Sequence, residues 1–224
     1  MPQQRVQTIF SDIPASVLYD ALHDPDYRKV WDDNMIQGFD LFHLDANNDV
    51  GYYAARLPAP LKNRDFLNQR SWFAAADGSE YIIMNHTVAH DECPPKKEFI
   101  RAVSILTGYL VRPSGESSSS SSSGCQLTYI TQTDPRGSIP KALVNKGAAA
   151  FAPKIMTKLY ETSKKYPAWK EKNNPDHKPW IKFDASKTRV VSVEELKKHQ
   201  TDVAASLGAK DDTVVTDDTP VGDA

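Results

Sequence analysis

Apolar and polar residues alternate along much of the chain up to residue 133, and this two-residue period is typical of β-strands with one buried face. Seven stretches show it: 5–10, 35–44, 50–57, 66–76, 81–88, 99–111 and 125–133. Turn-forming pairs such as Asn47-Asn48 and Asp77-Gly78 separate neighbouring stretches. Because most of these connections are short, the pattern predicts an antiparallel meander.

A longer period of about 3.6 residues predicts helices in three places. An apolar stripe after Pro14 predicts a first helix, and a second short helix carries residues 27–31. After Ser138, apolar residues fall in two adjacent columns spaced four residues apart, which predicts a long helix with one broad apolar face. Pro153 is expected to kink this helix, and Pro167 is expected to end it.

Two segments carry no periodic pattern. Residues 117–123 are seven consecutive serines between the last two predicted strands, and such a tract is expected to be a disordered hairpin loop. From residue 181 on, the chain is polar and acidic and is expected to be mostly disordered. The sequence therefore predicts one folded domain over 1–180 and a tail over 181–224.

Composition narrows the class of protein. The chain has 224 residues, of which 40% are hydrophobic and 25% charged, as expected of a globular domain. It contains no run of about 18 apolar residues, so no transmembrane helix is predicted. Cys93 and Cys125 are too few for a disulfide framework and lack partners at metal-ligand spacing. We therefore expect a cytoplasmic protein with free thiols.

Charge is distributed unevenly along the chain. Residues 201–224 contain six aspartates and one lysine, whereas residues 139–166 contain six lysines and one glutamate. A basic helix followed by an acidic tail indicates binding to an anionic membrane surface. The alternative is an ordinary solvated helix face.

Sequence signals of catalysis are missing. The chain has no Gly-x-Ser-x-Gly elbow and no P-loop, and no nucleophile and base stand in a recognisable pattern. We therefore predict that the protein is not an enzyme and needs no cofactor or metal. Its aromatic residues are not interleaved with a basic strand, so nucleic acid is not expected as a partner.

The most informative residues are Arg28 and Asp32, four positions apart on the second predicted helix, with Trp31 between them. This spacing places the two charges on one face of a helix. A structural ion pair is one interpretation. A binding site for a zwitterionic group is the other, because a guanidinium binds phosphate while a carboxylate faces a cationic amine.

The chain resembles the START (StAR-related lipid transfer) family, and within it the phosphatidylcholine-transfer branch. The resemblance covers about residues 4–180 and rests on these motifs: YRKVWD (27–32), GYY (51–53), PLKNRD (60–65), YIIMN (81–85), IRAVS (100–104), TGYL (107–110), DPRGSIPK (134–141) and YPAWK (166–170). It implies an α+β helix-grip fold, in which a curved antiparallel sheet and a long C-terminal helix enclose one lipid. The family pattern starts with a helix and two strands before residue 4, so the resemblance also implies N-terminal truncation.

The resemblance assigns candidate ligand-binding residues. Arg28 and Asp32 are expected to point into the cavity. The positions that surround choline with aromatic rings in this branch match Tyr53, Phe66 and Ile105, so the cage is incomplete here and phosphatidylethanolamine becomes a second expected ligand. Arg101 is expected to be a buried charge that holds either a phosphate or a structural carboxylate.

The resemblance thus implies a protein that carries one glycerophospholipid, phosphatidylcholine or phosphatidylethanolamine, between membranes. The long C-terminal helix is expected to contact the anionic membrane surface transiently. The alternatives are a lipid-regulated protein-interaction module and a non-functional truncated product.

Overall fold

The computed structural model describes residues 3–114, 124–139 and 141–199. Its main feature is an eight-stranded sheet with the path β1-β8-β7-β5-β4-β3-β2. The strands are β1 (Gln4–Phe10), β2 (Met35–Asp45), β3 (Asn48–Ala55), β4 (Arg64–Ala74), β5 (Tyr81–Thr87), β6 (Ile100–Arg101), β7 (Val103–Ser114) and β8 (Gly124–Asp134). Neighbours along the path pair antiparallel, which confirms the predicted meander. The serine tract lies outside the described residues.

The stretch 99–111, predicted as one strand, is divided in two. The short β6 pairs in parallel with β4 through Arg64 and Ile100, whereas β7 pairs with β5 and β8. Ala102 lies between them, fully buried, and its N–H donates to the Asp65 carbonyl. The chain therefore crosses from one strand to another at Ala102, a change that alternation alone does not reveal.

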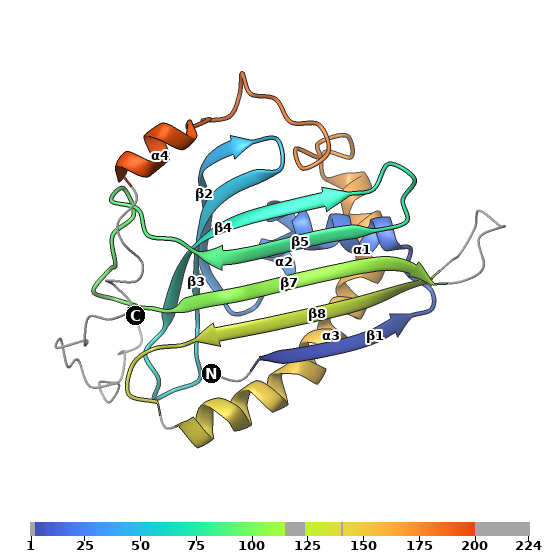
Figure 1. The fold of residues 1–224 in the computed structure, drawn as a ribbon. Helices are drawn as coiled ribbons and strands as arrows, with labels where there is room; N and C mark the ends of the chain where they lie inside the picture. Colours follow the sequence, from blue (N-terminus) through green and yellow to red (C-terminus); the bar gives the residue numbers. More distant parts are fainter. Residues whose placement is uncertain (1–2, 115–123, 140, 200–224) are drawn as a thin grey trace.

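The described residues form four helices: α1 (Ala15–His23), α2 (Pro25–Trp31), α3 (Lys141–Lys172) and α4 (Val193–His199). Figure 1 shows α1, α2 and much of α3 behind the sheet, on the side that is called here the inner face. Asp24 is the N-cap of α2, because its Oδ1 accepts from the backbone N–H groups of Asp26 and Tyr27.

The long helix does not end at Pro167 as predicted. It continues to Lys172, and its last turns are held against α2. Tyr166 Oη donates to Asp24 Oδ2 at 3.1 Å, and Lys170 Nζ lies 2.9 Å from the same oxygen. These buried contacts across the proline outweigh the loss of one helical hydrogen bond. The kink at Pro153 stays a prediction.

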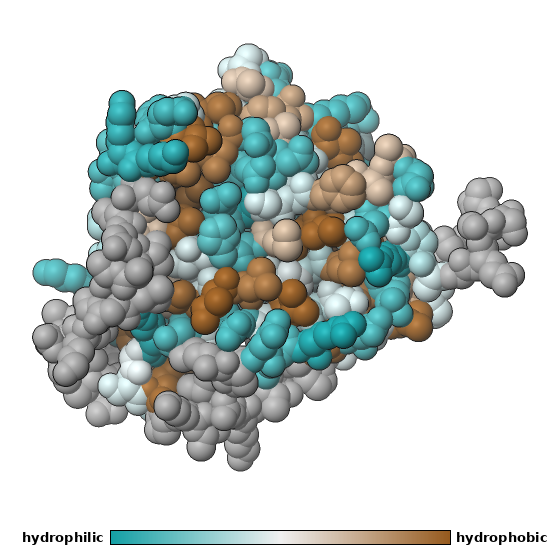
Figure 2. All heavy atoms as spheres, in the orientation of Figure 1, coloured by the Kyte–Doolittle hydropathy of each residue, from teal (hydrophilic) through white to brown (hydrophobic). Residues whose placement is uncertain are grey.

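Two apolar clusters stabilise the fold. The larger lies between the inner face of the sheet and helices α1, α2 and α3, with Leu18, Leu127 and Leu159 at its centre. The smaller lies on the outer face of β2, β3 and β4, where Phe42, Val50 and Leu67 are buried. The rest of the outer face carries scattered apolar side chains among polar ones (Figure 2), including Phe73 and Met84.

Residues 181–199 are folded against the domain, so the prediction of a disordered segment from residue 181 is wrong for them. Val190 forms a parallel bridge with His43 of β2, and Val191 is buried in the smaller cluster. Arg189 donates to both carboxylate oxygens of Glu92. Apolar residues within a polar sequence supply this packing, which average polarity does not reveal. Residues 200–224 lie outside the described residues.

Candidate functional site

The inner face of the sheet is divided into two halves that differ in packing. In the packed half, beneath α1, the inward side chains are buried: Trp72, Ile83, Val111 and Leu127 have at most 6% of their surface exposed. All four belong to the larger apolar cluster. This half is an ordinary hydrophobic core.

The open half follows along the same strands and consists of inward side chains that stay partly exposed. Its members are Tyr53, Phe66, Asn68, Asn85, Thr87, Thr107, Tyr109, Thr131 and Thr133. The register confirms that they continue the same face, because Asn85 pairs with Thr107 and Thr107 pairs with Thr131. Polar groups on the covered side of a sheet that remain accessible indicate a space suited to a ligand.

Arg28 lies at this space and is held by two neighbours. Its Nε donates to Asp32 Oδ2 at 2.9 Å, and Tyr53 Oη donates to the same oxygen at 2.9 Å. The guanidinium carbon lies 5.2 Å from the Tyr53 ring centroid and 4.9 Å from that of Trp31. The predicted pair of Arg28 and Asp32 therefore forms, and Tyr53 joins it from β3.

The electrostatics of Arg28 suit the binding of an anion. Burial opposes its charge, but Tyr53 and Asp32 outweigh this effect and raise the pKa of Arg28. Yet 33% of its side-chain surface is exposed, against 9% for Asp32. Its Nε is bound to Asp32, and a guanidinium held through Nε can present its terminal nitrogens to a phosphate side by side.

Aromatic rings surround this group. Phe66 lies 6.3 Å from Tyr53, centroid to centroid. Tyr109 and Tyr129 pair across β7 and β8 with centroids 5.0 Å apart. Tyr109 contributes to the raised pKa of Arg28, and burial raises its own pKa and that of Tyr53, the latter to about 12. The three tyrosines therefore remain neutral, and their rings can contact a cationic group.

Sequence reasoning missed Tyr109 and Tyr129. A signal for them existed, because the two strands form a hairpin around the serine tract. Alternation places Thr107 and Tyr109 on one face of the first strand and Tyr129 and Thr131 on one face of the second, and the structure pairs Tyr109 with Tyr129 and Thr107 with Thr131.

A START domain model matches residues 4–168 of the chain. The chain belongs to the START domain family. Mouse START domain-containing protein 10 is 47% identical over 206 residues, or 92% of this chain and 67% of the mouse protein. Human START domain-containing protein 10 is 48% identical over 85% of this chain and 63% of its own length. The crystal structure of human STARD10 matches with a TM-score of 0.79 and 45% identity, over 86% of this chain and 76% of that chain.

More distant relatives share the fold. Human phosphatidylcholine transfer protein is 22% identical over 73% of this chain and 74% of its own length. Human StAR-related lipid transfer protein 5 matches in structure with a TM-score of 0.61, at 21% identity, over 75% of this chain and 76% of that chain. The helix-grip fold predicted from the sequence is thereby confirmed, and so is lipid binding as the property of the family. Within the described residues, no helix is long and apolar enough to cross a membrane.

In this START domain Arg101 lies apart from the Arg28 group. Its Nε and Nη2 donate to the two oxygens of Asp65 at 3.1 and 3.0 Å, and Nη1 donates to the Cys93 carbonyl. Asp65 is fully buried. Of the two partners that the sequence left open, phosphate or a structural carboxylate, the structure has the carboxylate.

Ile105 is the sixth predicted site residue. It lies at a bulge of β7, with half of its surface exposed and outside both apolar clusters. The structure therefore gives it no core role, and its contact with a ligand stays a prediction.

One group of side chains has the composition of a cation site. Ligand atoms of Asp40, His43 and Asp49 lie within 4.8 Å of one another. Arg70, however, pairs with Asp49 and lies 3.7 Å from Asp40. The positive charge that these carboxylates need is therefore already supplied by the protein.

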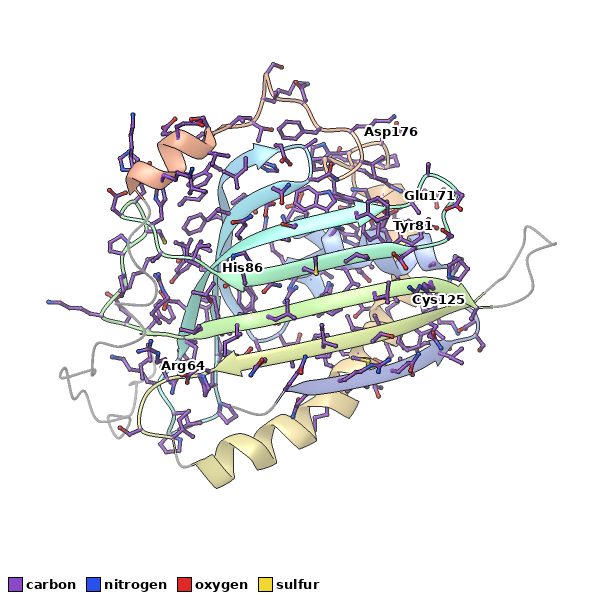
Figure 3. The ribbon with its side chains drawn as sticks, in the orientation of Figure 1. Arg64, Tyr81, His86, Cys125, Glu171 and Asp176 are labelled. Carbon is purple, nitrogen blue, oxygen red and sulfur yellow. The ribbon has the colours of Figure 1, made fainter. Side chains whose placement is uncertain are left out.

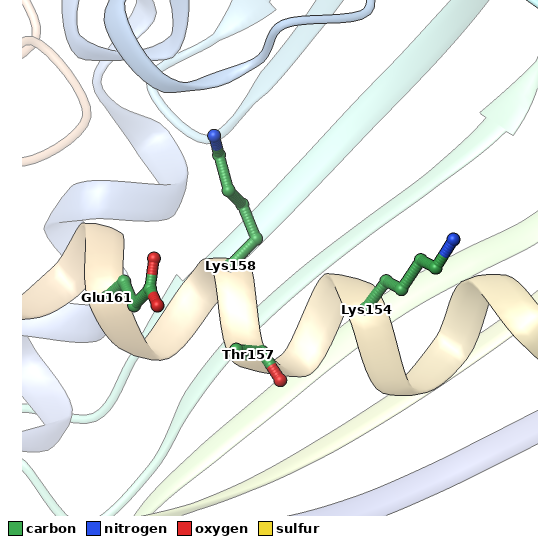
Figure 4. Close-up of a pocket in the computed structure, with 4 residues that line it drawn as sticks. All are labelled: Lys154, Thr157, Lys158 and Glu161. Carbon is green, nitrogen blue, oxygen red and sulfur yellow. The ribbon is translucent and has the colours of Figure 1, made fainter.

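A surface hollow of about 340 Å³ lies along α3 and is lined by Lys154, Thr157, Lys158 and Glu161 (Figure 4). Lys158 Nζ lies 2.7 Å from Asp33 Oδ2, so it links α3 to the residue after Asp32. Three of the four side chains that line the hollow are charged, and none of them belongs to the open half. The ion pair of Lys158 and Asp33 therefore joins α3 to the chain next to the Arg28 group, and it is weak because both side chains are exposed.

Proposed function

We propose that this START domain carries one molecule of phosphatidylcholine or phosphatidylethanolamine in the open half and transfers it between membranes. The phosphate binds the terminal nitrogens of Arg28, and the choline or ammonium group lies among Asp32, Tyr53 and Tyr109. The observation that carries the proposal is a charged, partly exposed Arg28 that is held in place by a hydrogen bond from its Nε to Asp32. The name of the related phosphatidylcholine transfer protein supports the ligand class.

Membrane contact is part of the proposal. Lysines 154, 158, 164 and 165 lie on the described part of α3, and Lys158 and Lys164 are engaged by single exposed carboxylates, Asp33 and Asp12. Anionic head groups compete well for such lysines, because exposed ion pairs contribute little. We propose that the cytoplasmic protein docks through α3 and that loss of the Lys158–Asp33 pair opens the site.

The test is transfer of fluorescent phosphatidylcholine and phosphatidylethanolamine between vesicles with and without 20% phosphatidylserine. The expected result for Arg28→Ala is a loss of bound phospholipid of about tenfold or more, since charged hydrogen bonds contribute about 1.5–3 kcal/mol. Its thermal stability should change little, because the replaced side chain is partly exposed. Lys172→Ala, which also removes one positive charge but lies at the C-terminal end of α3, serves as the control. A folded wild-type protein that neither binds nor transfers phospholipid would refute the proposal.

A further inference from the structure

A row of polar side chains crosses the open half from β8 to β4. The hydroxyl oxygens of Thr133 and Thr131 lie 3.3 Å apart, those of Thr131 and Thr107 3.3 Å, and those of Thr107 and Ser104 3.0 Å. Ser104 Oγ then donates to Asn85 Oδ1 at 3.4 Å. The row therefore ends on the amide of Asn85, in the middle of the inner face.

Asn68 reaches Asn85 from the other side. Its Nδ2 donates to Asn85 Oδ1 at 3.3 Å, and its own Oδ1 accepts from Thr87 Oγ1 at 2.9 Å. Thr87 Oγ1 in turn accepts from the Ser104 backbone N–H at 2.8 Å. Asn85 Oδ1 thus accepts two hydrogen bonds, from Ser104 and from Asn68.

With Asn85 Oδ1 as the acceptor at the end of the row, the direction of each hydroxyl proton follows. A hydroxyl has one proton, and Ser104 uses its proton on Asn85, so Thr107 must donate to Ser104, Thr131 to Thr107 and Thr133 to Thr131. In the structure the atom of Asn85 that faces both donors is its oxygen, Oδ1. Its Nδ2 therefore points away from both donors, and among the described residues no acceptor is recorded for it.

An amide nitrogen held in this way is a donor prepared for a ligand. Asn85 is partly exposed, so this N–H is accessible, and the hydrogen bonds from Ser104 and Asn68 hold the amide that carries it. Asn85 lies opposite Thr107, and Tyr109 follows Thr107 by two residues on the same face of β7. The ester groups of a phospholipid are hydrogen-bond acceptors, so a phospholipid held in the open half offers partners for this donor.

We infer that Asn85 Nδ2 binds an ester carbonyl oxygen of the carried phospholipid, and that Ser104, Thr107 and Asn68 are positioning residues. The inference rests on the proposed function and extends it from the head group to the glycerol ester linkage. It predicts that the protein distinguishes diacyl from dialkyl phospholipids, whose ether linkages lack the carbonyl oxygen.

The test uses dipalmitoyl phosphatidylcholine and its dihexadecyl ether analogue, which share head group and chain length. Competition between them for the purified chain is measured by native mass spectrometry. The wild type should prefer the diacyl lipid by about tenfold, the equivalent of about 1.4 kcal/mol and the size of one hydrogen bond. Asn85→Leu should bind both lipids equally. Asn85→Asp, which keeps the acceptor for Ser104 and Asn68 but lacks the N–H, should also lose the preference.

The matched control is His86→Ala. His86 is the neighbour of Asn85 on β5 and points to the outer face; it lies near one end of the strand, and Tyr81 lies at the other (Figure 3). It should keep the tenfold preference. A wild type that binds both lipids equally well would overturn the role of Asn85 and leave the proposed function intact. A preference that survives in both Asn85 variants would do the same. Failure to bind either lipid would overturn both proposals.

Discussion

The packed and open halves lie on the same strands, and the boundary between them falls within a few residues on each strand. On β8, Leu127 is fully buried, whereas Thr131, four residues later on the same face, is partly exposed. In the packed half, apolar side chains meet α1 and fill the space. In the open half, hydroxyl and amide groups satisfy one another along the sheet and leave the space free. A sheet face thus becomes a core or a site according to whether its side chains reach the helices or pair with each other.

Arg101 and Arg28 extend this comparison, and replacing Arg101 gives the largest expected loss of stability. Arg101→Ala leaves the fully buried Asp65 without its partner and should lower the free energy of unfolding by about 3–5 kcal/mol. Arg28→Ala should lower it far less, because Arg28 faces the open half. Urea unfolding of both variants measures the difference. Equal losses of stability would mean that Arg28, too, is a structural residue.

A pair on β8 tests the two halves directly. Leu127→Ala removes a side chain at the centre of the larger cluster and should cost about 2–5 kcal/mol. Thr131→Ala removes one hydroxyl of the row and should cost about 1 kcal/mol, the net value of an ordinary hydrogen bond. Thermal unfolding of the two variants at one pH compares them. If Thr131→Ala were as damaging as Leu127→Ala, the open half would be core.

The sequence predicts the strands of both halves but not the boundary between them. Alternation identified β4, β5 and β8, because it records which side chains share a face. It does not record what lies opposite: Trp72 and Asn68 share a face of β4, and only the position of α1 makes one a core residue. The spacing of Arg28 and Asp32 predicted their contact because four residues along a helix is a local distance. Arg101 and Asp65 are joined only through β6, whose parallel pairing no local pattern announces.

Residues 181–199 have a low apolar content, which predicts a tail rather than a folded segment. In the structure the backbone of His43 accepts from Val191 and donates to Arg189. The buried Val191, the ion pair of Arg189 with Glu92 and these backbone hydrogen bonds to the edge strand β2 hold the segment. Composition averaged over a window cannot detect a contact of three residues.

The two halves should also differ in how they treat charge, and His23 in the packed half provides the test. It is 3% exposed, lies 5.2 Å from the Trp72 ring and stacks on Trp180 at 5.8 Å, and its Nε2 has no hydrogen-bond partner among the described residues. Burial therefore lowers its pKa well below the usual value of 6.5, whereas Arg28 in the open half remains charged.

The sign of the pH effect follows from this shift. Because the folded state binds the His23 proton more weakly than the unfolded state, its contribution to stability is complete above about pH 6.5 and falls as the pH drops below it. At pH 5.5 the loss should be about 1.4 kcal/mol relative to pH 7.5, the value of one pH unit. Urea unfolding at both pH values measures it, with His23→Phe as the variant in which this part of the pH dependence disappears. A His23→Phe protein that keeps the full wild-type dependence would show that the packed half accepts a proton, and the contrast with the open half would then rest on packing alone.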